Sequence, residues 1–343
     1  MMNWDIIGHR WAVEQLRASI QAGSDAHAYL IGGPPGLGKA LLALRIAQAL
    51  NCESSPGDPC LSCRACRRIA HGNHPDVRLA SMERQAAGLK AEEAARQKEL
   101  KIATVREWQR DIALRPYEGR RRVLLLHDAE RLSEEAANAM LKTLEEPPPH
   151  ATLILVANST DLLPTIVSRC RVLRLRPLPR QQVAEALIAR GVAAADAALL
   201  AAWSGGRIGW ALALLDDPEA LARRSAQLTD LLAIHAEGRG AGMRWAEQRA
   251  KEYRGGEQET VFAWLELWQG WWRDVLLIAA GSPEGVVNID RHTELQQAAR
   301  RHPLPQIFDF VSRIGQAAQQ LRENGNPQLV LENLALHLPR AAM

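Results

Sequence analysis

The sequence predicts an α/β domain with a parallel sheet, followed by a region that is helical throughout. Two observations support this prediction. Up to about residue 176, short and almost wholly apolar segments alternate with segments that favour helices, which is typical of parallel strands covered on both faces. From Pro177 and Pro179 onward the chain shows no convincing strand pattern. The fold class is therefore α/β and then all-α.

The predicted elements follow from local patterns. Apolar residues at helical spacing indicate a helix over 9–22, and an apolar run that stops at a glycine loop indicates a strand over 28–31. Further helices are predicted over 40–50, 104–114 and 133–145, and further strands over 76–80, 122–127 and 152–157. The segment 81–101 is rich in Ala, Glu, Lys, Arg and Gln, which indicates a helical or mobile solvated segment.

Composition narrows the class of protein. The 343 residues leave room for two or three domains, and a net charge of +3 is too weak to indicate nucleic-acid binding by itself. No apolar run approaches the roughly 20 residues of a membrane helix, and the N-terminus lacks the pattern of a secretory signal. We therefore expect a cytoplasmic protein, where clustered cysteines favour a metal over disulfides.

A phosphate-binding loop is predicted between the first strand and the second helix. Residues 33–39 fit the pattern G-x-x-x-x-G-K. Gly33, Gly36 and Gly38 allow backbone N–H groups to wrap phosphates, and Lys39 suits the terminal phosphates at a helix N-terminus.

Two chemical roles of such a site are vacant. Ala40 stands where Ser or Thr would ligate magnesium. Asp128 supplies the expected strand-end aspartate, but Ala129 follows it where ATPases of the AAA+ class carry a water-activating glutamate. Glu130 lies one position later, and this shift makes it a poor substitute. The loop is then either an ATP or ADP site that hydrolyses slowly or not at all, or a structural relic.

Four of the five cysteines lie close together in the chain and predict a structural zinc site. They read C-x7-C-x2-C-x2-C and are Cys52, Cys60, Cys63 and Cys66. Four thiolates can close a tetrahedral site and leave no open position for catalysis. The alternative is a set of unrelated free thiols. His71 and His74 are expected to be ordinary surface or packing residues, and Cys170 is too remote in sequence to assign to the site.

The order of these features resembles the bacterial clamp-loader family of AAA+ proteins, which includes the gamma/tau and delta prime subunits of DNA polymerase III. After the cysteine insert and the strand that ends at Asp128, the chain reads NAMLKTLEEPP over 138–148 and Ser-Arg-Cys over 168–170. The resemblance covers most of residues 1–215. Residues 326–334 also resemble the last collar helix of the family.

The resemblance implies three domains: an AAA+ module over 1–176 with the zinc insert over 52–66, a helical lid over 177–217, and a helical collar over 218–343. In these pentamers ATP lies between subunits, and the arginine of Ser-Arg-Cys reaches the ATP of a neighbour. Arg169 takes that position here. As an arginine finger, it would stabilise charge that develops on the phosphates.

Within the family, Ala40 and Ala129 favour the delta prime type over the working ATPase, as does a chain that ends soon after the collar. The intact Gly38-Lys39 and a shortened first cysteine gap depart from that type. The resemblance implies gamma/tau and delta subunits, the sliding clamp and primer–template DNA as partners. The chain would belong to a DNA-directed DNA polymerase holoenzyme, a nucleotidyltransferase, without ATPase or polymerase activity of its own.

Two alternatives stay open at this point: an active gamma/tau-type ATPase, and a zinc-containing regulatory DNA-binding protein on an inactive AAA+ scaffold. Asn158-Ser159 and Gly205-Gly206-Arg207 resemble two sensors of the terminal phosphate, or serve in capping and turns. The helically spaced tryptophans are expected to pack in the collar, and they are Trp264, Trp268, Trp271 and Trp272.

Overall fold

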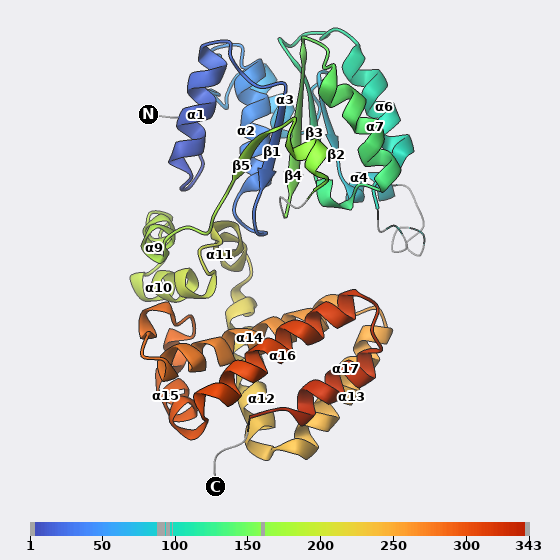
Figure 1. Ribbon diagram of the computed structural model, residues 1–343. Helices are drawn as coiled ribbons and strands as arrows, with labels where there is room; N and C mark the ends of the chain where they lie inside the picture. The colour runs from blue at the N-terminus through green and yellow to red at the C-terminus, as the bar shows by residue number, and fades with distance from the viewer. Residues whose placement is uncertain (1–3, 88–92, 94–96, 98, 159–161, 340–343) are drawn as a thin grey trace. The chain divides into compact units, whose positions relative to one another are not determined.

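The chain divides into two compact units in the computed structural model (Figure 1). The structure describes residues 4–87, 93, 97, 99–158 and 162–339. One unit comprises Met1–Gln182 with Gly206–Trp210, and the other comprises Val183–Gly205 with Ala211–Met343. The predicted fold class, α/β and then all-α, is confirmed by a parallel sheet in the first unit and helices in the second. The three-domain layout stays a prediction.

The first unit is built on a five-stranded parallel sheet with the order β2-β3-β4-β1-β5. The strands are β1 (Ala28–Gly32), β2 (Val77–Ala80), β3 (Arg122–Leu126), β4 (Ala151–Ala157) and β5 (Arg171–Arg174). The sequence did not predict β5. Its sequence, Arg-Val-Leu-Arg, places only two apolar residues between charged ones, and of its four side chains only Leu173 is buried. An edge strand needs fewer buried contacts than the central strands, so it lacks the apolar run that marked the others.

Helices cover both faces of this sheet (Figure 1). Tyr29 and Ile31 of β1 join one core with α1 (Arg10–Gln21), α2 (Lys39–Asn51) and α3 (Arg64–Ala70). Leu30 points to the other core, with α6 (Ile102–Ala113), α7 (Glu134–Glu145) and the short α8 (Pro164–Val167). The alternation follows from the pleat of the strand, because successive side chains point to opposite faces. Both faces of β1 are therefore buried, as its apolar sequence predicted.

The segment 81–101 begins with the short helix α4 (Met82–Ala86), which Ser81 caps by accepting the Arg84 N–H. The predicted helical or mobile character of 88–92, 94–96 and 98 lies outside the described residues. A short 3-10 turn, η1 (Ala129–Arg131), follows β3. Among the described residues, the helices are too short or too polar to span a bilayer.

The remaining helices and 3-10 turns follow β5. They are α9 (Arg180–Ile188), α10 (Ala194–Trp203), α11 (Ile208–Leu215), α12 (Pro218–Glu237), α13 (Arg239–Arg254), α14 (Gln258–Ala279), η2 (Pro283–Gly285), η3 (Ile289–Arg291), α15 (His292–Arg301), α16 (Leu304–Arg322) and α17 (Pro327–Leu336). The core of the second unit contains all four tryptophans of α14, which confirms their predicted packing role. Trp268 stacks on Trp245 of α13 with ring centroids 4.4 Å apart.

A buried polar network joins α10 to the helices beyond α11. The guanidinium of Arg224 lies 3.8 Å from the ring centroid of Trp203 and donates to Asn288 Oδ1 at 2.6 Å. The fully buried Asp274 accepts from the side chain and the backbone N–H of Asn288, both at 2.7 Å. The ring of Trp203 and the oxygen of Asn288 hold the Arg224 guanidinium, although its buried Nη1 has no hydrogen-bond partner among the described residues. This gives a physical reason for the grouping of α10 with α12 to α17 in one compact unit.

Candidate functional site

The predicted phosphate loop connects β1 to α2, with Gly38 at the N-cap of α2. All three of its glycines have a positive φ, of 145° at Gly33, 80° at Gly36 and 84° at Gly38. A Cβ on Gly33 would lie 2.5 Å from the carbonyl oxygen of Leu175, so a larger residue cannot stand there. Glycine adopts a positive φ without steric cost, so these three residues allow a loop backbone that other residues would adopt only with strain.

Lys39 lies mostly buried within this loop, with 6% of its surface exposed. Its ammonium donates to the carbonyl oxygens of Gly33 and Pro34, both at 2.7 Å, and to Asn158 Oδ1 at 3.1 Å. Burial lowers the pKa of Lys39, and the negative charge of Glu130 opposes that shift. The ammonium is thus held by the chain's own oxygens, which a bound phosphate would have to replace.

Glu130 takes a larger part in this site than its position in the sequence suggested. Its Oε1 accepts a hydrogen bond of 2.8 Å from Asn158 Nδ2, so Glu130, Asn158 and Lys39 form one connected chain. All three line a cavity of about 320 Å³ that also contains Ala40 and Asp128. The sequence could not show this contact, because 28 positions separate Glu130 from Asn158.

The strand-end acidic position differs in detail from the prediction. Strand β3 ends at Leu126, one residue earlier than predicted, so His127 is the first residue beyond it. Asp128 has a left-handed φ of 56°, and its Oδ2 accepts a 3.2 Å hydrogen bond from the Met82 N–H at the start of α4. Ala129 is buried and offers only a methyl group.

The predicted second sensor lies against the tip of the phosphate loop. The Gly209 N–H donates to the carbonyl oxygen of Gly36 at 2.7 Å, and a Cβ on Gly36 would lie 3.3 Å from Cβ of Arg207. The Arg207 guanidinium lies 5.7 Å from the ring centroid of Trp210. Of the predicted first sensor, Asn158 contacts Lys39, whereas Ser159 lies outside the described residues.

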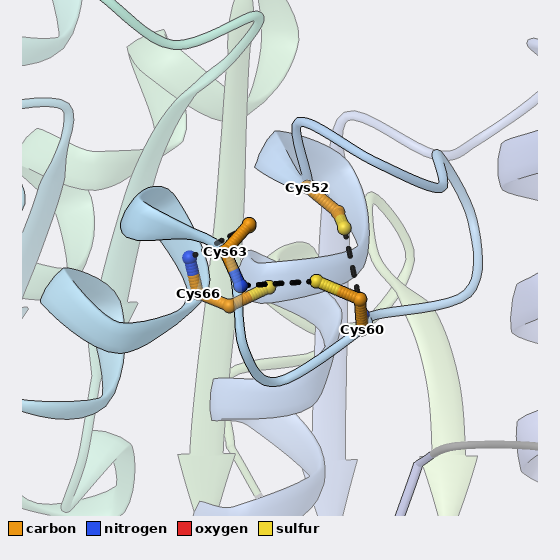
Figure 2. Close-up of side chains that lie close together, drawn as sticks. All are labelled: Cys52, Cys60, Cys63 and Cys66. Atoms are coloured by element: carbon orange, nitrogen blue, oxygen red, sulfur yellow. Dashed lines mark hydrogen bonds between the residues drawn. The ribbon is translucent and has the colours of Figure 1, made fainter.

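The four cysteines of the predicted zinc site come together after α2 (Figure 2). Their Sγ atoms all lie within 4.8 Å of one another. Backbone N–H groups donate to three of these sulfurs, from Cys60 to Cys52 at 3.5 Å, from Cys63 to Cys60 at 3.2 Å and from Cys66 to Cys63 at 3.4 Å. Such N–H donation stabilises thiolates, so the donor set suits a tetrahedral thiophilic metal ion.

The cysteine thiols differ in acidity. Burial alone would raise the pKa of Cys60, but the N–H groups of Cys63 and Ser62 outweigh it and lower that pKa to about 5. Burial raises the pKa of Cys66. His71 and His74 bond elsewhere, with His71 Nδ1 2.7 Å from the Arg67 carbonyl oxygen and His74 Nδ1 accepting from the Asp76 N–H. Among the described residues, the group of side chains that could hold a metal ion consists of the four predicted cysteines and includes neither histidine.

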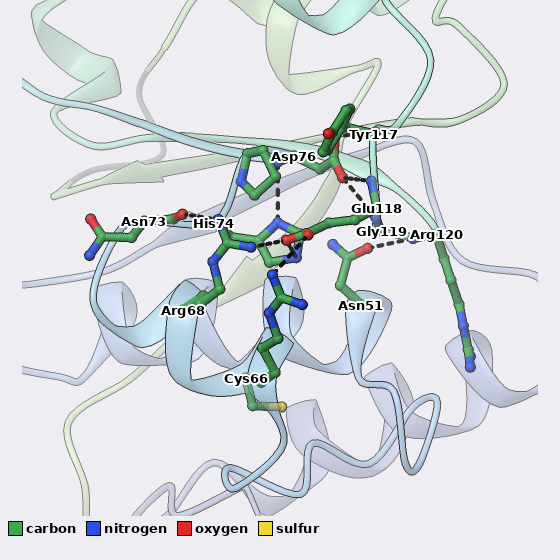
Figure 3. A network of polar contacts seen from close by, with 12 residues as sticks. Asn51, Cys66, Arg68, Asn73, His74, Asp76, Tyr117, Glu118, Gly119 and Arg120 are labelled. Atoms are coloured by element: carbon green, nitrogen blue, oxygen red, sulfur yellow. Dashed lines mark hydrogen bonds and ion pairs between the residues drawn. The ribbon is translucent and has the colours of Figure 1, made fainter.

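A polar network ties Asn51 and Asp76, which lie before and after the cysteine insert in the chain, to the loop before β3 (Figure 3). Buried Asp76 accepts from the N–H groups of Tyr117, Glu118 and Gly119 at 2.7, 2.9 and 2.7 Å. Asn51, which directly precedes Cys52, accepts from the N–H groups of the next two loop residues. The loop is therefore held through its backbone by two side chains that the sequence did not single out.

Replacing Asp76 with asparagine is expected to destabilise the first unit by about 3 kcal/mol, because one acceptor becomes a donor facing N–H groups. Burial would raise the pKa of Asp76, but the three N–H donors and Arg122 hold it below its ordinary value. The carboxylate therefore stabilises the fold above the unfolded pKa, and this stabilisation is lost as pH falls through the lower folded pKa.

Urea unfolding at pH 7 and near pH 3 measures both effects. The variant should lose less stability than the native chain between these two values. Asp230→Asn, an exposed site on α12, should behave like the native chain. An Asp76→Asn variant with native stability and native pH dependence would contradict the assigned role.

Arg169 lies just beyond α8. Its guanidinium donates from Nη1 to the Thr165 carbonyl oxygen at 2.9 Å and to Ser168 Oγ at 3.3 Å. Its Nη2 donates at 2.6 Å to Oε1 of Glu145, which is the last residue of α7. About a third of the arginine side chain, 34%, is exposed. The arginine thus belongs to the first unit but lies apart from the contacts that surround Lys39.

Comparison with known proteins covers both units. A family model described as "DNA polymerase III, delta subunit" matches residues 8–179, and one described as "DNA polymerase III, delta subunit, C terminal" matches residues 218–339. The DNA polymerase III subunit delta' of Bacillus subtilis is 28% identical over 93% of each chain. The chain belongs to the DNA polymerase III delta prime family. The resemblance that the sequence motifs indicated is confirmed.

Other members of the wider group match parts of the chain. The subunit delta' of Escherichia coli is 36% identical over 62% of this chain and 61% of its own length. The Escherichia coli subunit tau is 33% identical over 52% of this chain and 26% of its own length. A solved gamma subunit-related protein of Thermotoga maritima covers 95% of this chain and 98% of its own, at 18% identity and a TM-score of 0.40. The part of this chain that matches the Escherichia coli subunit tau therefore covers only about a quarter of the length of that relative.

Proposed function

We propose that this chain is the delta prime-type subunit of a pentameric clamp loader, which loads the sliding clamp onto primed DNA. Family membership across both units carries this proposal. The proposed partners are gamma/tau and delta subunits, the clamp, and primer–template DNA within the complex, in the cytoplasm. The chain would act as part of the DNA polymerase III holoenzyme without polymerase or ATPase activity of its own.

The proposed chemistry of the chain lies in the ATP site of a neighbour. Arg169 is partly exposed, and its guanidinium is held by hydrogen bonds that water or phosphate oxygens can replace. A planar cation with parallel N–H donors suits the charge that develops on transferring phosphate oxygens. We therefore assign Arg169 as the arginine finger that this subunit supplies.

The chain's own nucleotide site is proposed to be deficient in hydrolysis. Ala40 cannot ligate magnesium and Ala129 cannot activate water. The Asp128 carboxylate accepts from the backbone at the start of α4, and the Lys39 ammonium donates to the loop's own carbonyl oxygens. ATP or ADP could bind where Gly33, Gly36 and Gly38 form the loop, if phosphate oxygens replace those carbonyls.

The cysteine cluster is proposed to hold a structural Zn²⁺ ion through four thiolates. The short distances between the sulfurs and the N–H groups directed at three of them support this assignment. With all four positions of the tetrahedron filled by protein, the ion would stabilise the insert and do no chemistry.

The second candidate function, an active gamma/tau-type ATPase, has one specific observation in its favour. Glu130 lies in the same cavity as Lys39 and connects to it through Asn158. A carboxylate so placed could orient water despite the shift in sequence. The observation does not supply the magnesium ligand missing at Ala40, so we favour the non-hydrolysing subunit.

Lys39→Ala distinguishes the two functions, because an active site would lose its main phosphate-binding cation. We expect the purified chain to show no ATP turnover above background. We also expect the reconstituted complex of this chain with its ATPase, delta and clamp subunits to hydrolyse ATP equally well with either form of the chain. Filter binding with ATP measures whether Lys39 binds nucleotide. Turnover by the isolated chain that Lys39→Ala abolishes would establish the ATPase instead.

A further inference from the structure

The contact between Arg169 and Glu145 joins the Ser-Arg-Cys motif of 168–170 to the motif NAMLKTLEEPP of 138–148. Glu145 is the last residue of α7, and Arg169 follows α8. At 2.6 Å from nitrogen to oxygen, the contact has the length of a charge-assisted hydrogen bond. Thr165 and Ser168 occupy the other terminal nitrogen of the guanidinium. Both terminal nitrogens are therefore engaged by oxygens of the same chain.

This arrangement limits what the guanidinium can reach. An arginine that binds a phosphate end-on donates from both terminal nitrogens. Each terminal nitrogen carries two N–H groups. Nη1 already donates to two acceptors, Thr165 and Ser168, so such binding requires that Nη1 release one of them, and Glu145 holds one of the two N–H groups of Nη2. A carboxylate also repels an approaching phosphate, so the two anions compete for one cation.

The ion pair is weak enough to be exchanged. The side chain of Arg169 is 34% exposed and that of Glu145 is 51% exposed, so water and salt screen their attraction. A triphosphate carries more negative charge than one carboxylate, and it offers several oxygens to the same guanidinium. An exposed ion pair can therefore hold the arginine while no triphosphate is near, and a triphosphate that approaches can replace the carboxylate.

We propose that Glu145 is a positioning residue, which holds Arg169 on its own chain until an anionic phosphate of a neighbouring nucleotide replaces it. The proposal rests on the proposed function, because it takes Arg169 as the residue that enters the neighbour's site. It adds a restraint on that residue. Glu145 keeps the guanidinium in place before the neighbour's ATP is engaged, and it lowers the chance of premature contact.

The matched variants are Glu145→Gln and Glu146→Gln. The first keeps the size and one oxygen of the side chain but removes the charge that attracts Arg169. The second makes the same change at the next residue, whose side chain is also exposed. A general effect of charge at the end of α7 would appear in both variants, whereas loss of the restraint would appear only in Glu145→Gln.

The first measurement uses the full-length chain alone and does not depend on partners. Phenylglyoxal modifies free guanidinium groups, and mass spectrometry of peptides reports the rate at Arg169. We expect Glu145→Gln to raise that rate roughly two- to fivefold, the range of an exposed ion pair, and Glu146→Gln to leave it unchanged. Equal rates in the native chain and Glu145→Gln would overturn the proposal.

The second measurement uses the reconstituted complex. Glu145→Gln should raise ATP turnover without DNA roughly two- to fivefold, with a smaller change once DNA is saturating, while Glu146→Gln matches the native complex. In an Arg169→Ala background Glu145→Gln should have no further effect, because the residue acts through the arginine. An equal effect in both backgrounds would overturn the proposal.

The two measurements separate the two claims. If Arg169→Ala leaves turnover native, the arginine-finger function fails, while a raised modification rate in Glu145→Gln still supports the restraint on Arg169. If Arg169→Ala abolishes stimulation and the modification rate is unchanged in Glu145→Gln, the finger stands and Glu145 has no positioning role.

Discussion

Arg169→Ala is expected to lower DNA-stimulated ATP hydrolysis by about a thousandfold at the one site that this arginine reaches. The loss follows from the chemistry of phosphoryl transfer, because negative charge that develops on the phosphate oxygens loses its planar cation. Total ATP turnover of the complex should fall by at least the fraction that this one site contributes. The fall is larger if hydrolysis at the other sites depends on hydrolysis at this one. Steady-state turnover with primed DNA measures the fall.

Arg169→Lys gives a sharper version of the same experiment. Lysine keeps the positive charge but lacks the fork of parallel N–H donors, so we expect it to recover little of the lost rate. Arg67→Ala, at an exposed arginine of α3, should leave turnover unchanged. All three variants should assemble with the partner subunits as the native chain does. Native turnover in an intact complex that contains Arg169→Ala would refute the finger assignment.

The second large effect is expected at the cysteine cluster. Cys66 is fully buried in α3, and its carbonyl oxygen accepts a 2.8 Å hydrogen bond from Gln48. Cys66→Ser removes one of four thiolates, and a site of three thiolates and a hydroxyl holds zinc far more weakly. Because metal binding is coupled to folding, we expect the variant to lose its zinc and at least about 4 kcal/mol of stability.

Zinc content by elemental analysis and thermal unfolding of the native chain and the variant measure both effects. Chelation of the native chain should reproduce the loss of stability. Cys170→Ser is the matched control, because Cys170 lies outside the four-cysteine cluster. It should keep one zinc ion per chain. Full zinc content in Cys66→Ser would show that four thiolates do not form the site.

Much of the architecture could be predicted from local sequence patterns. Strands β1, β3 and β4 are buried on both faces, so their apolar runs are unambiguous, and the glycines of 33–38 specify a loop backbone that few other residues adopt. The cysteine spacing predicted the clustering of the four sulfurs. Strand β5 was missed because its two adjacent apolar residues, between two arginines, are too short a run to indicate a buried strand.

The sequence by itself therefore determined the strand–loop–helix order, the vacancies at Ala40 and Ala129, and the four cysteines of the insert. These features depend on residue type and on spacing within one element. Only the tertiary structure decided that Glu130 joins Lys39 through Asn158, and that Glu145 holds Arg169. Such contacts arise where the sheet and its helices bring distant segments together, and a linear pattern does not encode which side chains then meet.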